Sequence, residues 1–152
     1  MLAHARITLR GDVLFIDEIQ SDWHQGLAGR KEVPASEFPG FPGRNEPPVP
    51  FASDWERLVL KHLLAYAVEA GVDTVALTDA ATIAPVVGGD KASLSGFYDK
   101  RLLDVFSALV KRLGGSVEGV KVKGFSETFP GVRMTPALRR AICSGFDLWG
   151  KT

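Results

Sequence analysis

A hairpin pattern near the N-terminus constrains the fold more than any other feature of this sequence. Residues 5–9 alternate polar and apolar side chains, residues 11–12 are Gly-Asp, and residues 13–16 are Val-Leu-Phe-Ile. Alternation is typical of a strand with one solvated face, whereas a short unbroken apolar run is typical of a buried strand. Two such runs joined by a glycine-containing turn predict a β-hairpin. The second strand is therefore expected in the middle of a sheet.

Helix and strand patterns alternate through the rest of the chain. Ser53 and Glu56 form a capping-box pattern that begins a helix ending at Gly71, and Thr135-Pro136 begins the last helix. The first helix is expected to bury a stripe of apolar residues, namely Trp55, Leu58, Val59, Leu63, Tyr66 and Ala67. A further helix is expected over residues 97–113, and strands over residues 73–77, 117–122 and 132–134.

Two stretches are expected to be loops. Residues 26–50 hold six of the nine prolines, and residues 80–96 are mostly small and include Pro85. The first loop is expected to be mobile or to cover the polar residues that precede it. The resulting order, β-β-α-β-α-β-β-α, predicts a single α/β domain over residues 1–152, with helices packed on a mixed sheet.

Composition excludes several classes of function. Eighteen basic residues balance eighteen acidic ones, so no overall positive field favours nucleic acid or an anionic membrane. The single cysteine, Cys143, excludes an internal disulfide and a cysteine-based zinc site, and it is expected to be packed in the last helix. No apolar run approaches the length of a membrane span. A soluble, cytosolic protein is expected.

The octapeptide Glu18–Gln25 is the strongest candidate for a functional site, because it places polar residues directly after a buried strand. Ligands of open α/β folds bind at the carboxyl ends of strands. If the strand is regular, Glu18 shares the face of Ile16, where partial desolvation would raise the pKa of its carboxyl toward that of a general base. The alternative is that Glu18 and Asp22 only brace the turn that follows.

Other residues add weaker signals. Tyr98 is a candidate proton donor or stacking group at the start of a helix, and Lys100 a candidate anion contact, although both suit a helix boundary equally well. Lys61 lies mid-helix and is most simply a surface residue. Residues 25–30 contain two glycines after a strand, so their amides could hold a phosphate. Spacing of the histidines and carboxylates does not match a metal motif, and no metal site is expected.

The candidate site residues follow from these patterns. Candidate catalytic residues are Glu18, Asp22 and Tyr98. Candidate binding residues are Gln20, Ser21, His24, Gln25, Arg30, Lys61, Asp99 and Lys100.

The segment from Val13 to Gln25 resembles a signature of the polyvalent proteins of bacteriophages and conjugative elements. Further pieces of the resemblance follow in the same order along the chain: His4-Ala-Arg6, Pro50-Phe51, Leu60-Lys61, Gly96–Lys100 and Thr135–Arg139. The resemblance implies an accessory domain that acts on or binds a host component, including a defence system.

A second resemblance concerns the order of the elements. A strand that ends in an acidic residue, a long helix, a strand, and a helix opening with Phe-Tyr-x-Lys are similar to the core of the GNAT acyltransferases. This resemblance implies acetyl coenzyme A as cofactor. Glu18 or Asp22 would then deprotonate an amine, strand amides would hold the thioester oxygen, and Tyr98 would protonate the leaving thiolate. A catalytically inactive module that binds a host or phage protein through the same surface is the third possibility.

Overall fold

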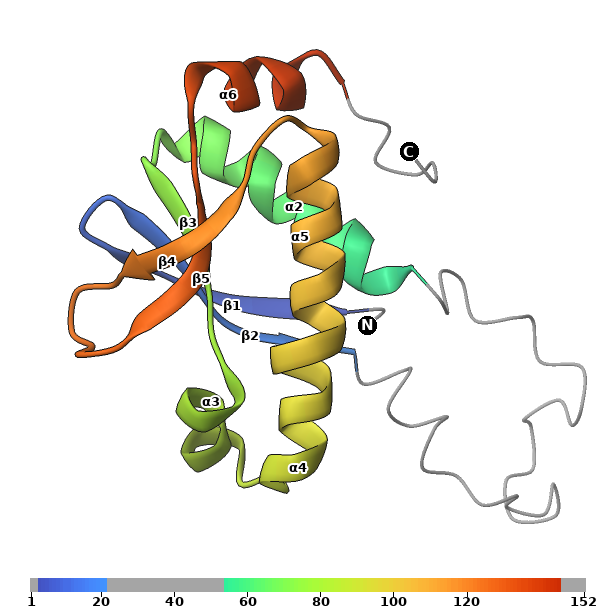
Figure 1. Ribbon diagram of the computed structural model, residues 1–152, viewed down its shortest axis with the longest axis vertical. Helices are drawn as coiled ribbons and strands as arrows, with labels where there is room; N and C mark the ends of the chain where they lie inside the picture. Colours follow the sequence, from blue (N-terminus) through green and yellow to red (C-terminus); the bar gives the residue numbers. More distant parts are fainter. Residues whose placement is uncertain (1–2, 22–53, 146–152) are drawn as a thin grey trace, which may run out of the picture.

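The computed structural model describes residues 3–21 and 54–145, and these residues form an α/β domain (Figure 1). Its mixed sheet has the strand order β1-β2-β3-β5-β4. The strands are β1 (His4–Arg10), β2 (Val13–Gln20), β3 (Thr74–Leu77), β4 (Val117–Lys121) and β5 (Thr128–Arg133). The predicted fold class is confirmed. The predicted loop over residues 26–50 lies outside the described residues.

The predicted hairpin is confirmed, and its second strand is internal to the sheet. β1 pairs with β2 in antiparallel register, with Arg10 opposite Val13 next to the turn. On its other side β2 runs parallel to β3, from Val13 opposite Thr74 to Ile16 opposite Leu77. Antiparallel pairing of β5 with both β3 and β4 completes the sheet. The unbroken apolar run in β2 therefore matches a strand with neighbours on both sides.

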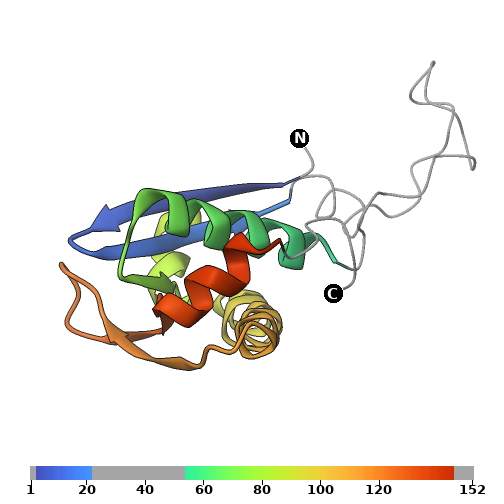
Figure 2. The ribbon, with the colours of Figure 1, turned by 90° about the horizontal axis from the view of Figure 1, so that it is seen from above.

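Helices cover one face of this sheet. They are α2 (Trp55–Ala70), α3 (Ala80–Val87), α4 (Lys91–Leu94), the π-helical segment η2 (Ser95–Leu102), α5 (Leu103–Arg112) and α6 (Pro136–Cys143). In both ribbon views α2, α5 and α6 lie together on the same side of the strands (Figures 1 and 2). The main core lies between these helices and the sheet, and Leu60, Leu102, Phe106 and Val110 are fully buried in it.

A smaller apolar cluster lies on the opposite face. Phe15, Phe125 and Phe129 meet there with ring centroids about 5 Å apart, and two of the three pairs are edge to face. The guanidinium of Arg10 lies 4.8 Å from the centroid of Phe125 and donates to the carbonyl of Lys123 at 3.3 Å. This contact joins the tip of the first hairpin to the segment between β4 and β5.

The prediction of a loop over residues 80–96 is wrong, because α3, α4 and the first residues of η2 occupy it. The Asp79 carboxylate accepts a hydrogen bond from the amide of Thr82 at 2.8 Å and so caps α3. The small residues of this stretch obscured the helical pattern. By contrast, the predicted cap of the last helix is confirmed, since the Thr135 hydroxyl accepts from the Leu138 amide at 3.1 Å.

The buried stripe of α2 differs from the predicted one. Leu60, Lys61 and Leu64 are buried, whereas Tyr66 is 45% exposed. The helix starts at Trp55 after Asp54, and Glu56 is buried in an ion pair with Arg101 at 2.6 Å. The prediction missed this rotation because it assigned charged residues to the solvent side. The predicted packing of Cys143 is also wrong, because its side chain is exposed.

Gly131 permits the close approach of β5 to β3. A methyl group added at its Cα would lie 2.6 Å from the carbonyl oxygen of Val75 and 2.7 Å from a side-chain methyl of Val120. Backbone cannot move aside there without disturbing the register of the sheet. At Gly119, the same methyl group would lie no closer than 3.5 Å to the Thr128 side chain, an ordinary contact distance.

We therefore expect Gly131→Ala to lower the free energy of unfolding by about 1–3 kcal/mol, the usual cost of overpacking. Gly119→Ala, in the same sheet, is expected to change it by less than about 0.5 kcal/mol. Urea unfolding followed by circular dichroism measures both values. Equal effects of the two substitutions would show that the contact with Val75 does not limit the residue at position 131.

Candidate functional site

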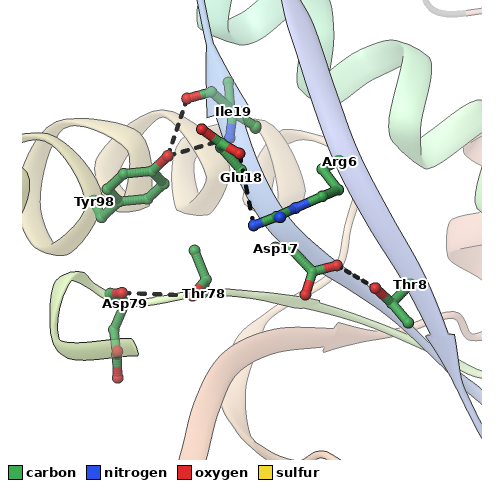
Figure 3. A network of polar contacts seen from close by, with 8 residues as sticks. All are labelled: Arg6, Thr8, Asp17, Glu18, Ile19, Thr78, Asp79 and Tyr98. Carbon is green, nitrogen blue, oxygen red and sulfur yellow. Dashed lines mark hydrogen bonds and ion pairs between the residues drawn. The ribbon is translucent and has the colours of Figure 1, made fainter. Parts of the chain in front are cut away.

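The candidate site lies where β2 continues beyond its parallel neighbour. The last hydrogen bond between the two strands joins the Thr78 amide to the Ile16 carbonyl at 3.0 Å. β3 ends at Leu77 and the chain turns into α3 at Ala80, while β2 runs on to Gln20. The two strands thus separate at their carboxyl ends, as Figure 3 shows for Thr78 and Ile19. In open α/β folds this edge is where ligands bind.

A β-bulge in β2 decides which groups reach this edge. In the register with β1, Ile16 lies opposite Ile7 and Glu18 opposite Arg6, so Asp17 is an extra residue. An extra residue interrupts the alternation of side chains between the two faces. Ile19 therefore joins Ile16 in the main core. The prediction that Glu18 shares the face of Ile16 is wrong, because it assumed a regular strand.

The bulge brings two carboxylates to the face opposite the helices. The Thr8 hydroxyl donates to the carboxylate of Asp17, and an Arg6 guanidinium nitrogen lies 3.6 Å from a carboxylate oxygen of Glu18. Both contacts are drawn in Figure 3. The side chain of Glu18 is 16% exposed, whereas that of Arg6 is 50% exposed. The carboxylate of Glu18 is therefore partly buried beside a positive charge that solvent still reaches.

Tyr98 closes the open edge of β2. Its hydroxyl accepts a hydrogen bond from the Ile19 amide at 3.2 Å and donates one to the Ile19 carbonyl at 3.1 Å. The hydroxyl thus takes the place that a neighbouring strand would fill, because Ile19 would otherwise leave a buried donor and a buried acceptor unpaired. Burial is the main cause that raises the pKa of Tyr98; the bond with Ile19 lowers it, and the charge of Glu18 raises it further.

Neighbouring residues of η2 hold other elements in place. A carboxylate oxygen of Asp99 accepts a hydrogen bond from the Ala80 amide at 3.0 Å, and its other oxygen accepts from the Ser95 hydroxyl at 2.9 Å. Asp99 therefore supports the first turn of α3, where exposed amides favour negative charge. Phe97 stacks on Trp55 of α2 with ring centroids 5.9 Å apart.

The structure brings together only part of the predicted site. Glu18 and Tyr98 lie at the same end of β2, and Ser21, the residue directly after β2, is fully buried. Gln20 is partly exposed, and Lys100 is exposed on η2. Four candidate site residues lie outside the described residues, namely Asp22, His24, Gln25 and Arg30.

Lys61 is a correction to the sequence analysis. It was expected on the surface, yet only 1% of it is exposed, and it is engaged with other groups of the protein. Burying an ammonium group requires compensating partners. Together with Leu60 and Leu64, Lys61 belongs to the buried face of α2.

Sequence reasoning missed the partners of Asp17 and Glu18, which are Thr8 and Arg6. Counting back from the hairpin turn, with Arg10 opposite Val13, would place Arg6 opposite Asp17 in a regular ladder. The bulge moves Arg6 opposite Glu18 instead. A search of the hairpin for cross-strand charge pairs would therefore have found Arg6, although with the wrong partner.

Over residues 3–21 and 54–145, no group of three or more histidine, cysteine, aspartate or glutamate side chains could hold a metal ion. Nor does any helix there have the length and apolar character needed to cross a membrane.

Comparison of the chain with known protein families, with curated proteins and with solved structures finds no match.

We expect Tyr98→Phe to lower the free energy of unfolding by about 1–3 kcal/mol, because it leaves the amide and carbonyl of Ile19 buried without a partner. Tyr66→Phe is the matched control, since the Tyr66 side chain is 45% exposed and its loss should cost less than about 0.5 kcal/mol. Urea unfolding measures both. A similar, small effect of the two substitutions would contradict the role assigned to the Tyr98 hydroxyl.

The raised pKa of Tyr98 predicts how stability depends on pH. The folded state favours the protonated phenol, so its contribution is fully present below the ordinary pKa of 10.0. It is lost as pH rises from there through the higher pKa of the folded state. Unfolding free energies measured between pH 8 and pH 11 should fall less steeply above pH 10 in Tyr98→Phe than in the unmodified protein. Parallel curves for the two proteins would contradict this prediction.

Proposed function

We propose that the domain is an acyltransferase of the GNAT type, with its reactive site at the end of β2. The observation that carries the proposal is the meeting of three groups at the carboxyl end of a parallel strand pair. These groups are the partly buried carboxylate of Glu18, the hydroxyl of Tyr98 and the backbone of Ile19. In this reading acetyl coenzyme A supplies the acyl group as a thioester.

Each of the three groups has a distinct part in the proposed reaction. The Glu18 carboxylate would remove a proton from the attacking amine, and Arg6, 3.6 Å away, would hold that carboxylate in place. The Ile19 amide would donate to the thioester oxygen as negative charge develops on it. Tyr98 would then give its proton to the sulfur that leaves. Asp22 remains a candidate base outside the described residues.

The contact between Tyr98 and Ile19 sets a condition on this reaction. In the described arrangement the Ile19 amide donates to the hydroxyl that would later act as the acid. The hydroxyl must therefore move from Ile19 to the leaving sulfur when the thioester binds. A tyrosine hydroxyl is protonated at neutral pH, so Tyr98 carries the proton that this step needs, although burial raises its pKa and makes it a weaker acid.

The first experiment tests the cofactor and the base together. Acetyl coenzyme A should raise the melting temperature of the purified protein, because it binds the folded state. Turnover is measured with a panel of amines and peptides as acetyl acceptors, and the release of free thiol is monitored. Glu18→Gln should reduce the rate about 10²–10⁴-fold while preserving the rise in melting temperature.

Glu118→Gln is the matched control for this substitution. Glu118 also pairs with an arginine across the sheet, Arg133, at 3.6 Å, but its side chain is 49% exposed and lies on the edge strand β4. The turnover of the Glu118→Gln variant should equal that of the unmodified protein. The proposal fails if neither coenzyme A nor acetyl coenzyme A changes the melting temperature at millimolar concentration.

A second candidate is a non-catalytic module that binds a host protein. It is favoured by the Tyr98 hydroxyl, which already uses both its donor and its acceptor on Ile19 and is 5% exposed as part of the core. The resemblance of the octapeptide to polyvalent proteins suggests the setting. The domain would bind a component of the host, including a defence system, in the host cytoplasm.

Charge reversal separates this candidate from the enzyme. Under the binding proposal, Glu18→Arg should abolish capture of a stoichiometric partner from host lysate, and Glu118→Arg should leave it unchanged. Acetyl coenzyme A should then have no effect on the melting temperature. Failure of the intact domain to capture any stoichiometric partner would count against this candidate.

A further inference from the structure

The helix that carries Tyr98 contains a segment with an unusual turn. α4, η2 and α5 follow one another without a break from Lys91 to Arg112, and Leu94 and Leu103, on either side of η2, have ordinary α-helical dihedral angles. Only the eight residues of η2 have the wider π-helical turn. Segments of this kind are rare, interrupt an otherwise regular α-helix, and are frequent at functional sites.

The wide turn determines where Tyr98 points. Four of the five buried residues of this helix recur every four positions, at Tyr98, Leu102, Phe106 and Val110, and the fifth is Leu109. In a regular α-helix of 3.6 residues per turn, each step of four moves the side chain roughly 40° around the axis. Three such steps would carry Tyr98 well away from the stripe that contains Val110. The wider turn of η2 offsets part of this drift and so directs Tyr98 at β2.

Tertiary contacts hold η2 in this form. Tyr98 binds the Ile19 backbone in β2, Asp99 binds the Ala80 amide at the start of α3, and Arg101 binds Glu56 of α2 at 2.6 Å. Two of these partners belong to helices. The partner of Tyr98 is the open edge of a strand, where a bound molecule with an amide or a carbonyl group can form the same hydrogen bonds.

We infer that η2 switches between two hydrogen-bond patterns and so controls access to the candidate site, as a latch would. We call the wide π-helical pattern the π register and the ordinary α-helical pattern the α register. In the π register Tyr98 occupies Ile19 and the site is closed. Displacement of Tyr98 from Ile19 removes one of the contacts that hold the wide turn, and the segment then relaxes to the α register. The Tyr98 side chain rotates away and the Ile19 amide becomes available. The identity of the ligand rests on the proposed function, whereas the two registers rest on the contacts alone.

Hydrogen-bond scalar couplings test the registers directly, because they identify the carbonyl that accepts each amide. In the unmodified, ligand-free protein, amides of η2 should couple to the carbonyl five residues earlier. In Tyr98→Phe they should couple to the carbonyl four residues earlier, and amide exchange at Ile19 should speed up at least tenfold. Tyr66→Phe should match the unmodified protein in both measurements.

The unmodified protein alone can overturn the latch, should Tyr98→Phe fail to fold. Coupling of its η2 amides to the carbonyl four residues earlier, with Tyr98 still on Ile19, would be enough. The latch is also wrong if Tyr98→Phe folds and keeps the wide turn and the slow exchange of Ile19. In that case η2 is a fixed scaffold for three elements.

The same measurement with ligand added distinguishes the latch from the proposed function. Acetyl coenzyme A added to the unmodified protein should shift the η2 couplings to the α register. Binding without that shift would overturn the latch and leave the acyltransferase proposal standing. No binding, together with a register change in Tyr98→Phe, would support the latch and remove acetyl coenzyme A as its ligand.

Discussion

The need to pair buried peptide groups shapes the whole of the candidate site. β2 extends past β3, so the amide and carbonyl of Ile19 face a side where no strand follows. Water cannot satisfy them, because Ile19 is 1% exposed. Leaving both the amide and the carbonyl without a hydrogen bond would cost free energy comparable to two lost hydrogen bonds. A single hydroxyl from a distant helix solves this problem. The position of Tyr98, and with it that of η2, follows from the mismatch in length between two parallel strands.

The bulge at Asp17 determines which chemical groups lie at the end of β2, where it extends past β3. Without the extra residue, the side chain of Glu18 would point toward the helices and the Ile19 backbone would face β1. With it, Glu18 lies opposite Arg6 on the face of the sheet away from the helices, and the Ile19 amide faces Tyr98. One inserted residue therefore brings a carboxylate, a phenol and a backbone donor to the same strand end. Bulges next to functional sites often redirect side chains in this way.

Local patterns made much of the architecture predictable from the sequence. The turn at residues 11–12, the apolar run of β2 and the cap at Thr135 each act over a few residues, and all three elements form as expected. The bulge was not predictable, because nothing in the order of residues 16–19 marks which of them is extra. Nor was the burial of Lys61, since its compensation depends on contacts made elsewhere in the fold. The sequence therefore located the strand end, while tertiary contacts decided which atoms meet there.

The contact of Arg10 with the segment after β4 has a consequence for how the molecule assembles. Arg10 and Lys123 are 113 positions apart in the chain, yet a hydrogen bond joins them, and the Arg10 guanidinium also lies 4.8 Å from the centroid of the Phe125 ring. Closing so long a stretch of chain is entropically costly, so we expect this contact to form late in folding. The two hairpins can each begin locally, but β3 lies between β2 and β5 in the sheet, so we expect the hairpin tips to meet only after β3 has been inserted. Protection of the Phe125 ring from solvent would therefore report the final step of assembly in a refolding experiment.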